Sequence, residues 1–201
     1  MREHVSGTNT VVASNTRNRK PTIGVMGSSR ADLSEMEVKR LTLMAQRLGQ
    51  AIADRGCVLI TGATTGFPDI VSRTARAAGC LTVGISPASS RTEHATKYSL
   101  PDDGADVIVY TGFGLKGRNV INVRSAEIVI IFGGGIGTLN EFTIAYDEGN
   151  VIGVLEGTGG VADQIKEITK LSRRPKRPEL VFESNPEDLI DSCLKMLAAQ
   201  I

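Results

Sequence analysis

The glycine-rich segment Gly133-Gly-Gly-Ile-Gly-Thr138 contains residue types that suit a phosphate group. Glycines let the backbone approach a ligand closely, and a helix that follows presents free amides and a positive dipole end to an anion. The dipole alone contributes only about 0.3–1 kcal/mol at an exposed site, so amide hydrogen bonds and a pocket must supply the rest. The segment lacks the Lys-Ser/Thr ending of a Walker A loop and the GxGxxG spacing. It predicts phosphate binding by Gly133, Gly134, Gly135, Gly137 and Thr138; the alternative is a tight turn without a ligand.

Two charged residues and a second glycine loop accompany this segment. Glu141 lies three residues after Thr138, where a carboxylate either stabilises the start of a helix or stands at the edge of a phosphate pocket. Arg118 is either a surface arginine or a guanidinium that clamps phosphate or sugar oxygens. The loop Gly62-Ala-Thr-Thr-Gly66 follows another apolar run and either binds ligand or is only a turn. Two glycine loops on one sheet favour a shared anion site.

Short apolar strands that alternate with helical segments must position these residues. We expect strands at 22–26, 58–61, 81–85, 106–110, 127–132 and 151–155, and helices after the capping box Ser34–Glu37, from Pro68 to Gly79, and over 117–125, 139–147, 160–171 and 186–199. Strands this apolar are typical of a parallel sheet covered on both faces. The sequence predicts a Rossmann-like, doubly wound, mainly parallel α/β sheet in a three-layer α/β/α sandwich. Ligands bind at the carboxyl ends of such strands, where Gly27 also lies.

The 201 residues divide into a short arm and a single domain. Residues 1–20 show no apolar periodicity and no hydrophobic signal region, so we expect a disordered N-terminal arm. Residues 21–201 form the Rossmann-like nucleotide-binding domain. The basic, proline-broken run Ser172–Pro178 is interpreted as a solvated loop rather than a nucleic-acid patch.

Composition excludes several classes of function. Lys+Arg 23 against Asp+Glu 22 gives a net charge of +1, which argues against nucleic-acid binding. No run approaches the ~20 apolar residues of a membrane span. The cysteines Cys57, Cys80 and Cys193 form no CxxC pair, so we expect no zinc site and a reducing, cytoplasmic setting. The two histidines, His4 and His94, are too few for an HExxH or multi-histidine metal centre, so we expect no metal in the site.

The segment from Gly133 to Glu141, Gly-Gly-Gly-Ile-Gly-Thr-Leu-Asn-Glu, resembles the PGGxGTxxE signature of the LONELY GUY (LOG) family, formerly labelled as lysine decarboxylases. Arg118 then falls on the arginine of the family's Arg-Lys motif, and Gly62–Gly66 on its earlier glycine-rich turn. The resemblance covers roughly residues 22–169 and indicates the LOG-like (SLOG) superfamily of nucleotide-binding proteins. Lysine decarboxylation is rejected, because no segment suggests a pyridoxal phosphate site.

The resemblance implies an activity and a division of labour. LOG enzymes hydrolyse nucleoside 5′-monophosphates, including cytokinin ribotides, to a free base and ribose 5-phosphate, and need no cofactor. Arg118 and Glu141 would be the catalytic residues, with the glycine loops, Gly27 and Asn119 binding the phosphorylated ligand. A carboxylate stabilises the oxocarbenium-like sugar of this reaction. The resemblance also implies a homodimer or higher homo-oligomer.

Two departures from the LOG signature point to a second function. Gly133 replaces the signature proline and Asn119 replaces the lysine after the arginine. These residues, the opening Gly24-Val-Met-Gly27 and the Arg-Asn-x-x-Asn run at 118–122 resemble the molybdenum cofactor carrier proteins, which bind a pterin phosphate without turning it over. Both functions stay open at this point. The expected partner is a small phosphorylated ligand, a nucleoside monophosphate or molybdenum cofactor, and not a nucleic acid or a membrane.

Overall fold

A parallel sheet runs through the computed structural model, which describes residues 19–27, 33–171 and 178–200. Most of the expected N-terminal arm and of the basic loop at 172–178 lies outside these residues. Within them, seven parallel strands have the order β4-β3-β2-β1-β5-β6-β7. The strands are β1 (Thr22–Gly27), β2 (Val58–Thr61), β3 (Leu81–Ser86), β4 (Val107–Tyr110), β5 (Ile128–Phe132), β6 (Val151–Leu155) and β7 (Leu180–Glu183).

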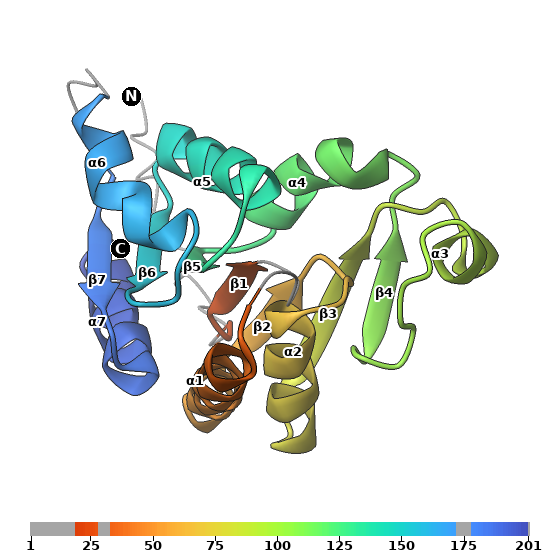
Figure 1. Cartoon of the computed structure of the whole chain (residues 1–201), viewed down its shortest axis with the longest axis horizontal. Coiled ribbons are helices and arrows are strands. Elements are labelled where there is room, and N and C mark those ends of the chain that lie inside the picture. The colour runs from red at the N-terminus through yellow and green to blue at the C-terminus, as the bar shows by residue number, and fades with distance from the viewer. Residues whose placement is uncertain (1–18, 28–32, 172–177, 201) are drawn as a thin grey trace, which may run out of the picture.

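Helices cover both faces of this sheet, as Figure 1 shows. They are α1 (Glu35–Asp54), α2 (Phe67–Ala77), α3 (Arg91–Thr96), α4 (Gly114–Arg124), α5 (Ile136–Glu148), α6 (Ile165–Lys170) and α7 (Pro186–Ala198), with a 3-10 turn at Ala162–Gln164. In Figure 1, α4, α5 and α6 lie on one side of the sheet, and α1, α2 and α7 on the other. The predicted Rossmann-like, three-layer α/β/α sandwich is therefore confirmed.

Two apolar clusters, one on each face of the sheet, form the core. One joins α1, α2 and α7 to the sheet, and the other joins α4, α5 and α6 to it. All five residues of β5 are buried completely, because this strand contributes to both clusters. The predicted capping box starts α1: Ser34 Oγ accepts from the Glu37 amide at 3.3 Å, and Glu37 Oε2 accepts from the Ser34 amide at 3.1 Å.

The strand order reverses between β1 and β5, and this reversal positions the site. β1 pairs with β2 on one side and with β5 on the other, with Gly27 in register with Phe132. β1 is followed along the chain by α1 on one side of the sheet and β5 by α5 on the other, the topology that places a crevice at the switch point. Both predicted glycine loops, after β2 and after β5, start from this edge of the sheet.

Some element boundaries differ from the sequence-based expectation. α4 begins at Gly114 rather than Gly117, and α5 at Ile136 rather than Leu139. Glycine destabilises the interior of a helix. The glycines of these two segments lie in or beside the first turn, where the loss of stability is smaller. The short helix α3 and the edge strand β7 were not expected at all. No helix among residues 19–27, 33–171 and 178–200 is long and apolar enough to cross a membrane.

Candidate functional site

A cavity of about 340 Å³ lies where the first turns of α4 and α5 meet the end of β1. Seven residues expected at the site line it together with Leu115 and Lys116: Gly27, Arg118, Asn119, Gly135, Gly137, Thr138 and Glu141. These residues come from three separate segments of the chain, so the topology, not sequence proximity, assembles them. The cavity lies at the switch point that the strand order predicts.

The loop between β5 and α5 is held by the segment that follows β6. The Gly133 amide donates to Thr158 Oγ1 at 2.9 Å, and the Gly134 carbonyl accepts from the Val161 amide at 2.8 Å. Gly134 has a φ of +98°, and a Cβ there would lie 2.4 Å from the Thr138 side chain. Gly133 and Gly134 therefore shape the loop without lining the cavity.

The first turn of α5 faces the cavity with unpaired amides. Gly135 is the N-cap residue and supplies no side-chain cap. The amides of the first helical residues have no intrahelical acceptor, and among these residues Gly137 and Thr138 line the cavity. This turn therefore provides hydrogen-bond donors and a positive dipole end for an anion.

A buried ion pair forms one wall of the cavity. Arg118 Nη1 lies 3.4 Å from Glu141 Oε1, and the two side chains are only 9% and 7% exposed. Asn122, completely buried on α4, donates from Nδ2 to the same Glu141 Oε1 at 3.2 Å and to Met26 Sδ at 3.0 Å. Both donors use Oε1, so Oε2 has no donor among the described residues. The carboxylate is thus fixed with one oxygen unoccupied.

Burial opposes both charges of this pair. Desolvation raises the pKa of Glu141, although the charges of Arg118 and Lys116 and the Asn122 hydrogen bond act in the other direction. Desolvation also lowers the pKa of Arg118, against the attraction of Glu141. Arg118 Nε and Asn122 Oδ1 are buried without a hydrogen-bond partner. A site that holds charged and unpaired polar groups in this way is typical of a ligand-binding centre.

The glycine loop after β2 acts on the site through Arg118. A Cβ at Gly62 would lie only 2.0 Å from Arg118 Nη1, so the guanidinium packs directly against this backbone. Gly66 is the N-cap of α2 with a φ of +95° and does not line the cavity. Gly62 therefore makes room for the arginine, whereas Gly66 forms the turn into α2.

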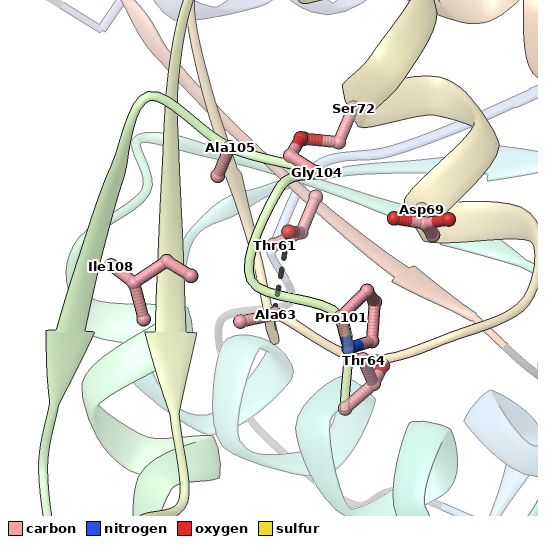
Figure 2. Close-up of a pocket in the computed structure, with 9 residues that line it drawn as sticks. All are labelled: Thr61, Ala63, Thr64, Asp69, Ser72, Pro101, Gly104, Ala105 and Ile108. Atoms are coloured by element: carbon pink, nitrogen blue, oxygen red, sulfur yellow. Dashed lines mark hydrogen bonds between the residues drawn. The ribbon is translucent and has the colours of Figure 1, made fainter. Parts of the chain in front are cut away.

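A second, very small cavity lies beside the same loop. It measures about 10 Å³ and lies between Thr61, Ala63 and Thr64 on one side and the segment Pro101–Ala105 on the other (Figure 2). The Ala63 amide donates to Thr61 Oγ1 at 3.4 Å, and Ser72 Oγ of α2 donates to the Gly104 carbonyl at 2.6 Å. These hydrogen bonds support the loop. The volume is about that of one water molecule, so the cavity is too small for a nucleotide.

Sequence reasoning missed several residues of the site. Leu115 and Lys116 line the cavity, and Asn122 and Thr158 hold the residues that do. The helical spacing of 115, 118, 119 and 122 could have placed these positions on one face of a helix. No group of three or more His, Cys, Asp or Glu side chains in the described parts of the chain could hold a metal ion.

The fold and the cavity together define a Rossmann-like protein that presents a helix N-terminus and a buried arginine–glutamate pair to a ligand. The chain belongs to the SLOG cluster4 family, whose model matches residues 20–190. It is thus a member of the LOG superfamily of nucleotide-binding proteins, as the glycine motif predicted.

Relatives of the chain include two curated proteins. An uncharacterized protein of Archaeoglobus fulgidus is 35% identical over 67% of this chain and 79% of its own length. The cytokinin riboside 5′-monophosphate phosphoribohydrolase of Mycobacterium tuberculosis is 32% identical over 53% of this chain. The match spans about half of that enzyme, 54% of its length.

Solved structures similar to this chain include molybdenum cofactor proteins. The molybdenum cofactor binding protein of Rippkaea orientalis is 32% identical with a TM-score of 0.71, over 89% of this chain and 98% of that one. The molybdenum cofactor carrier protein of Chlamydomonas reinhardtii is 29% identical with a TM-score of 0.69, over 90% and 99%. Both similarities extend over nearly the whole of each protein.

Proposed function

We propose that the protein binds a nucleoside 5′-monophosphate in the cavity between α4 and α5 and hydrolyses its N-glycosidic bond to the free base and ribose 5-phosphate. One observation carries this proposal: the buried Arg118–Glu141 pair lines the same cavity as the free amides of Gly137 and Thr138. The amides would bind the phosphate, and the carboxylate would lie within reach of the sugar. The M. tuberculosis relative, named as a phosphoribohydrolase, supports this activity.

Glu141 would act on the sugar through its unoccupied oxygen. In the reaction the C1′–N bond breaks with its electron pair leaving on the base, water adds to C1′, and the proton lost by that water is balanced by protonation of the base. C1′ becomes positively charged as the bond breaks, and a carboxylate held nearby stabilises that charge. Glu141 Oε1 is held by Arg118 and Asn122, so Oε2 is the oxygen available to the ribose. The charge of Arg118 helps to keep the buried carboxylate ionised.

Turnover of a nucleotide panel tests this proposal. The protein is incubated with AMP, GMP, CMP, UMP and isopentenyl-AMP, and free base and ribose 5-phosphate are both quantified. The Glu141→Gln variant is the matched control, because it preserves the shape of the side chain and removes its charge. Release of both products that disappears in the variant supports the hydrolase. A folded protein that releases neither product from any member of the panel contradicts it.

A second function, carriage of molybdenum cofactor, is favoured by the nearly full-length similarity to the two molybdenum cofactor proteins. The site fits the phosphate end of such a pterin, since the first turn of α5 and Arg118 line the cavity and Arg118 Nε has no hydrogen-bond partner among the described residues. Asn119 supports carriage as well, because the position after Arg118 carries a neutral amide in place of the lysine of the LOG motif. Its Nδ2 donates to Asn140 Oδ1 at 2.8 Å. When bound, the cofactor would be a redox-active cargo.

The molybdenum and pterin content of the purified protein distinguishes the carrier from the hydrolase. Metal analysis and fluorescence of the oxidised pterin, on protein expressed in a host that makes the cofactor, would detect both molybdenum and pterin. Recovery of both together with no nucleotide turnover favours the carrier. Absence of molybdenum and pterin from protein that hydrolyses the nucleotide panel contradicts the carrier function.

Assembly and location follow as smaller proposals. Phe113, Leu115 and Ile136 are apolar, 67%, 51% and 75% exposed, and belong to α4 and α5 or their caps. Large exposed apolar side chains on two helices that contact each other support the expected homodimer or higher homo-oligomer, which light scattering of the purified chain would test. The three cysteines are free and buried, which supports a reducing, cytoplasmic setting.

A further inference from the structure

We infer that Lys116 is a phosphate ligand of the cavity and gives it a preference for ligands that carry a phosphomonoester. This inference rests on the proposed binding of a phosphorylated ligand, but not on hydrolysis. Lys116 lines the cavity and is exposed. Its Nζ lies 3.9 Å from the position that a Cβ on Gly137 would occupy, so the ammonium stands over the first turn of α5.

Among the described residues that line the cavity, Lys116 is the cation without an ion-pair partner. Arg118 is paired with Glu141 at 3.4 Å, and Asn119 carries no charge. The ion pairs within the described residues do not include Lys116, and its charge acts on Glu141 only from a distance. An anion that enters the cavity therefore meets an ammonium group that forms no ion pair with a carboxylate of the described segments.

A phosphate dianion needs such a group beside the helix. The dipole of α5 provides about half an elementary charge, whereas a phosphomonoester carries close to two at neutral pH. The α5 amides would contact the phosphate from one side and Lys116 Nζ from the other. Arg118 lines the same cavity, and its Nε, on a side chain that is 9% exposed, has no hydrogen-bond partner among the described residues and offers a further donor.

The position of Lys116 determines which part of the ligand it affects. The ammonium stands near the α5 turn, while the cavity-lining carboxylate of Glu141 is buried and held by Asn122. Removal of the charge should weaken binding of the phosphate group and leave binding of an unphosphorylated nucleoside unchanged. Because Lys116 is exposed, its contribution should also decrease as salt concentration rises.

A thermodynamic cycle by calorimetry tests this. The ligands are formycin 5′-monophosphate and formycin, whose carbon–carbon glycosidic bond resists hydrolysis, and the proteins are wild type and Lys116→Met. We expect the variant to bind the monophosphate about tenfold more weakly and formycin unchanged. The wild type should also lose affinity for the monophosphate more steeply with salt than the variant does. Lys116→Arg should retain most of the affinity.

Lys39→Met is the matched control, because Lys39 is an exposed lysine of α1 that does not line the cavity. It should bind both ligands as the wild type does. Equal affinity of wild type and Lys116→Met for the monophosphate overturns the inference while nucleotide binding stands. If the wild type binds no nucleotide, the cycle is repeated with inorganic phosphate. Phosphate binding that needs Lys116 then supports the inference without the proposed function, and no phosphate binding overturns both.

Discussion

Replacing Gly62 by alanine perturbs the contact between the β2–α2 loop and Arg118. The new Cβ would lie 2.0 Å from Arg118 Nη1 and 2.4 Å from Cζ, and Cβ contacts under 3.0 Å are essentially never found. The guanidinium must therefore move by roughly an ångström. Its movement would lengthen the contact between Arg118 Nη1 and Glu141 Oε1, which at 3.4 Å is already long for a hydrogen bond.

The expected size of this effect follows from where the guanidinium can go. Arg118 is long and flexible, but it is 9% exposed and packed in the site, so its displacement resembles overpacking of a core. Overpacking costs about 1–3 kcal/mol of unfolding free energy. In an Arg118→Ala background the clash is absent, and the same glycine-to-alanine change should cost almost nothing. The two substitutions should therefore show a coupling energy of about 1–3 kcal/mol.

Urea unfolding of the four proteins, followed by circular dichroism, measures that coupling. Gly137→Ala is a matched control, since its Cβ would contact only Lys116 Nζ, at an ordinary 3.9 Å; a glycine-to-alanine change within a helix should not destabilise the protein. Additive effects of Gly62→Ala and Arg118→Ala would refute the reasoning, because they would mean that the guanidinium does not rest on Gly62. The single variant Gly62→Ala should also lose nucleotide turnover, because Arg118 no longer holds Glu141.

Three further predictions concern the acid and the phosphate site. Glu141→Gln should abolish hydrolysis and keep affinity for the phosphorylated ligand, since it removes the carboxylate charge that stabilises the oxocarbenium-like sugar and leaves the α5 amides in place; loss of binding with unchanged turnover per bound ligand would contradict this. In the wild type, turnover should fall on acidification at a pH above the pKa of an ordinary glutamate, because burial raises the pKa of Glu141. A pH–rate profile in which turnover falls only at the pKa of an ordinary glutamate would oppose that. The folded state binds this proton more tightly than the unfolded state does, so the contribution of Glu141 to stability rises as pH falls through its raised pKa. Thr138→Val removes a hydroxyl beside the α5 amides and should weaken ligand binding in calorimetry; unaltered affinity would place the phosphate elsewhere.

The sheet could be predicted from the sequence because its strands are apolar and bounded by polar or glycine residues. β2 and β6 begin and end at the expected residues, and β1, β3, β4 and β5 differ by one residue at an end. Parallel strands covered on both faces appear as continuous apolar runs, and β5, completely buried, is the clearest case. The capping box at Ser34 and Glu37 likewise predicted the start of α1, since both of its hydrogen bonds are local.

The missed elements lack such local signals. β7 (Leu180–Glu183) has four residues and only one of them is buried, because it is an edge strand that pairs with β6 alone. α3 (Arg91–Thr96) has six residues with too few turns to show an apolar periodicity. Its buried His94 is held by contacts to residues outside the helix, from Nδ1 to Ser86 Oγ at 2.8 Å and from Nε2 to the Pro101 carbonyl at 2.9 Å.

The site could be predicted in part, and the missing part is three-dimensional. The glycine loop after β5 and its helix were visible as a pattern, whereas the placing of Arg118 and Glu141 in one site was implied only by a resemblance. Their contact, which joins α4 to α5, was not predicted. Gly62 was expected to bind phosphate by analogy with other glycine loops. The structure places it against Arg118, a contact between the β2–α2 loop and α4 that spacing along the chain does not reveal.

The arrangement of Glu141 links stability to chemistry. Asn122 and Arg118 both occupy Oε1, and Asn122 is itself held by Met26 at the end of β1. Two donors on one oxygen fix the orientation of the carboxylate, and burial makes its charge costly in the free protein. A ligand that brings positive charge, or hydroxyl donors, to Oε2 would remove part of that cost on binding. An oxocarbenium-like ribose does both, whereas a pterin phosphate held through its phosphate alone does neither. Oε2 is therefore the atom whose contacts in a ligand complex would separate turnover from carriage.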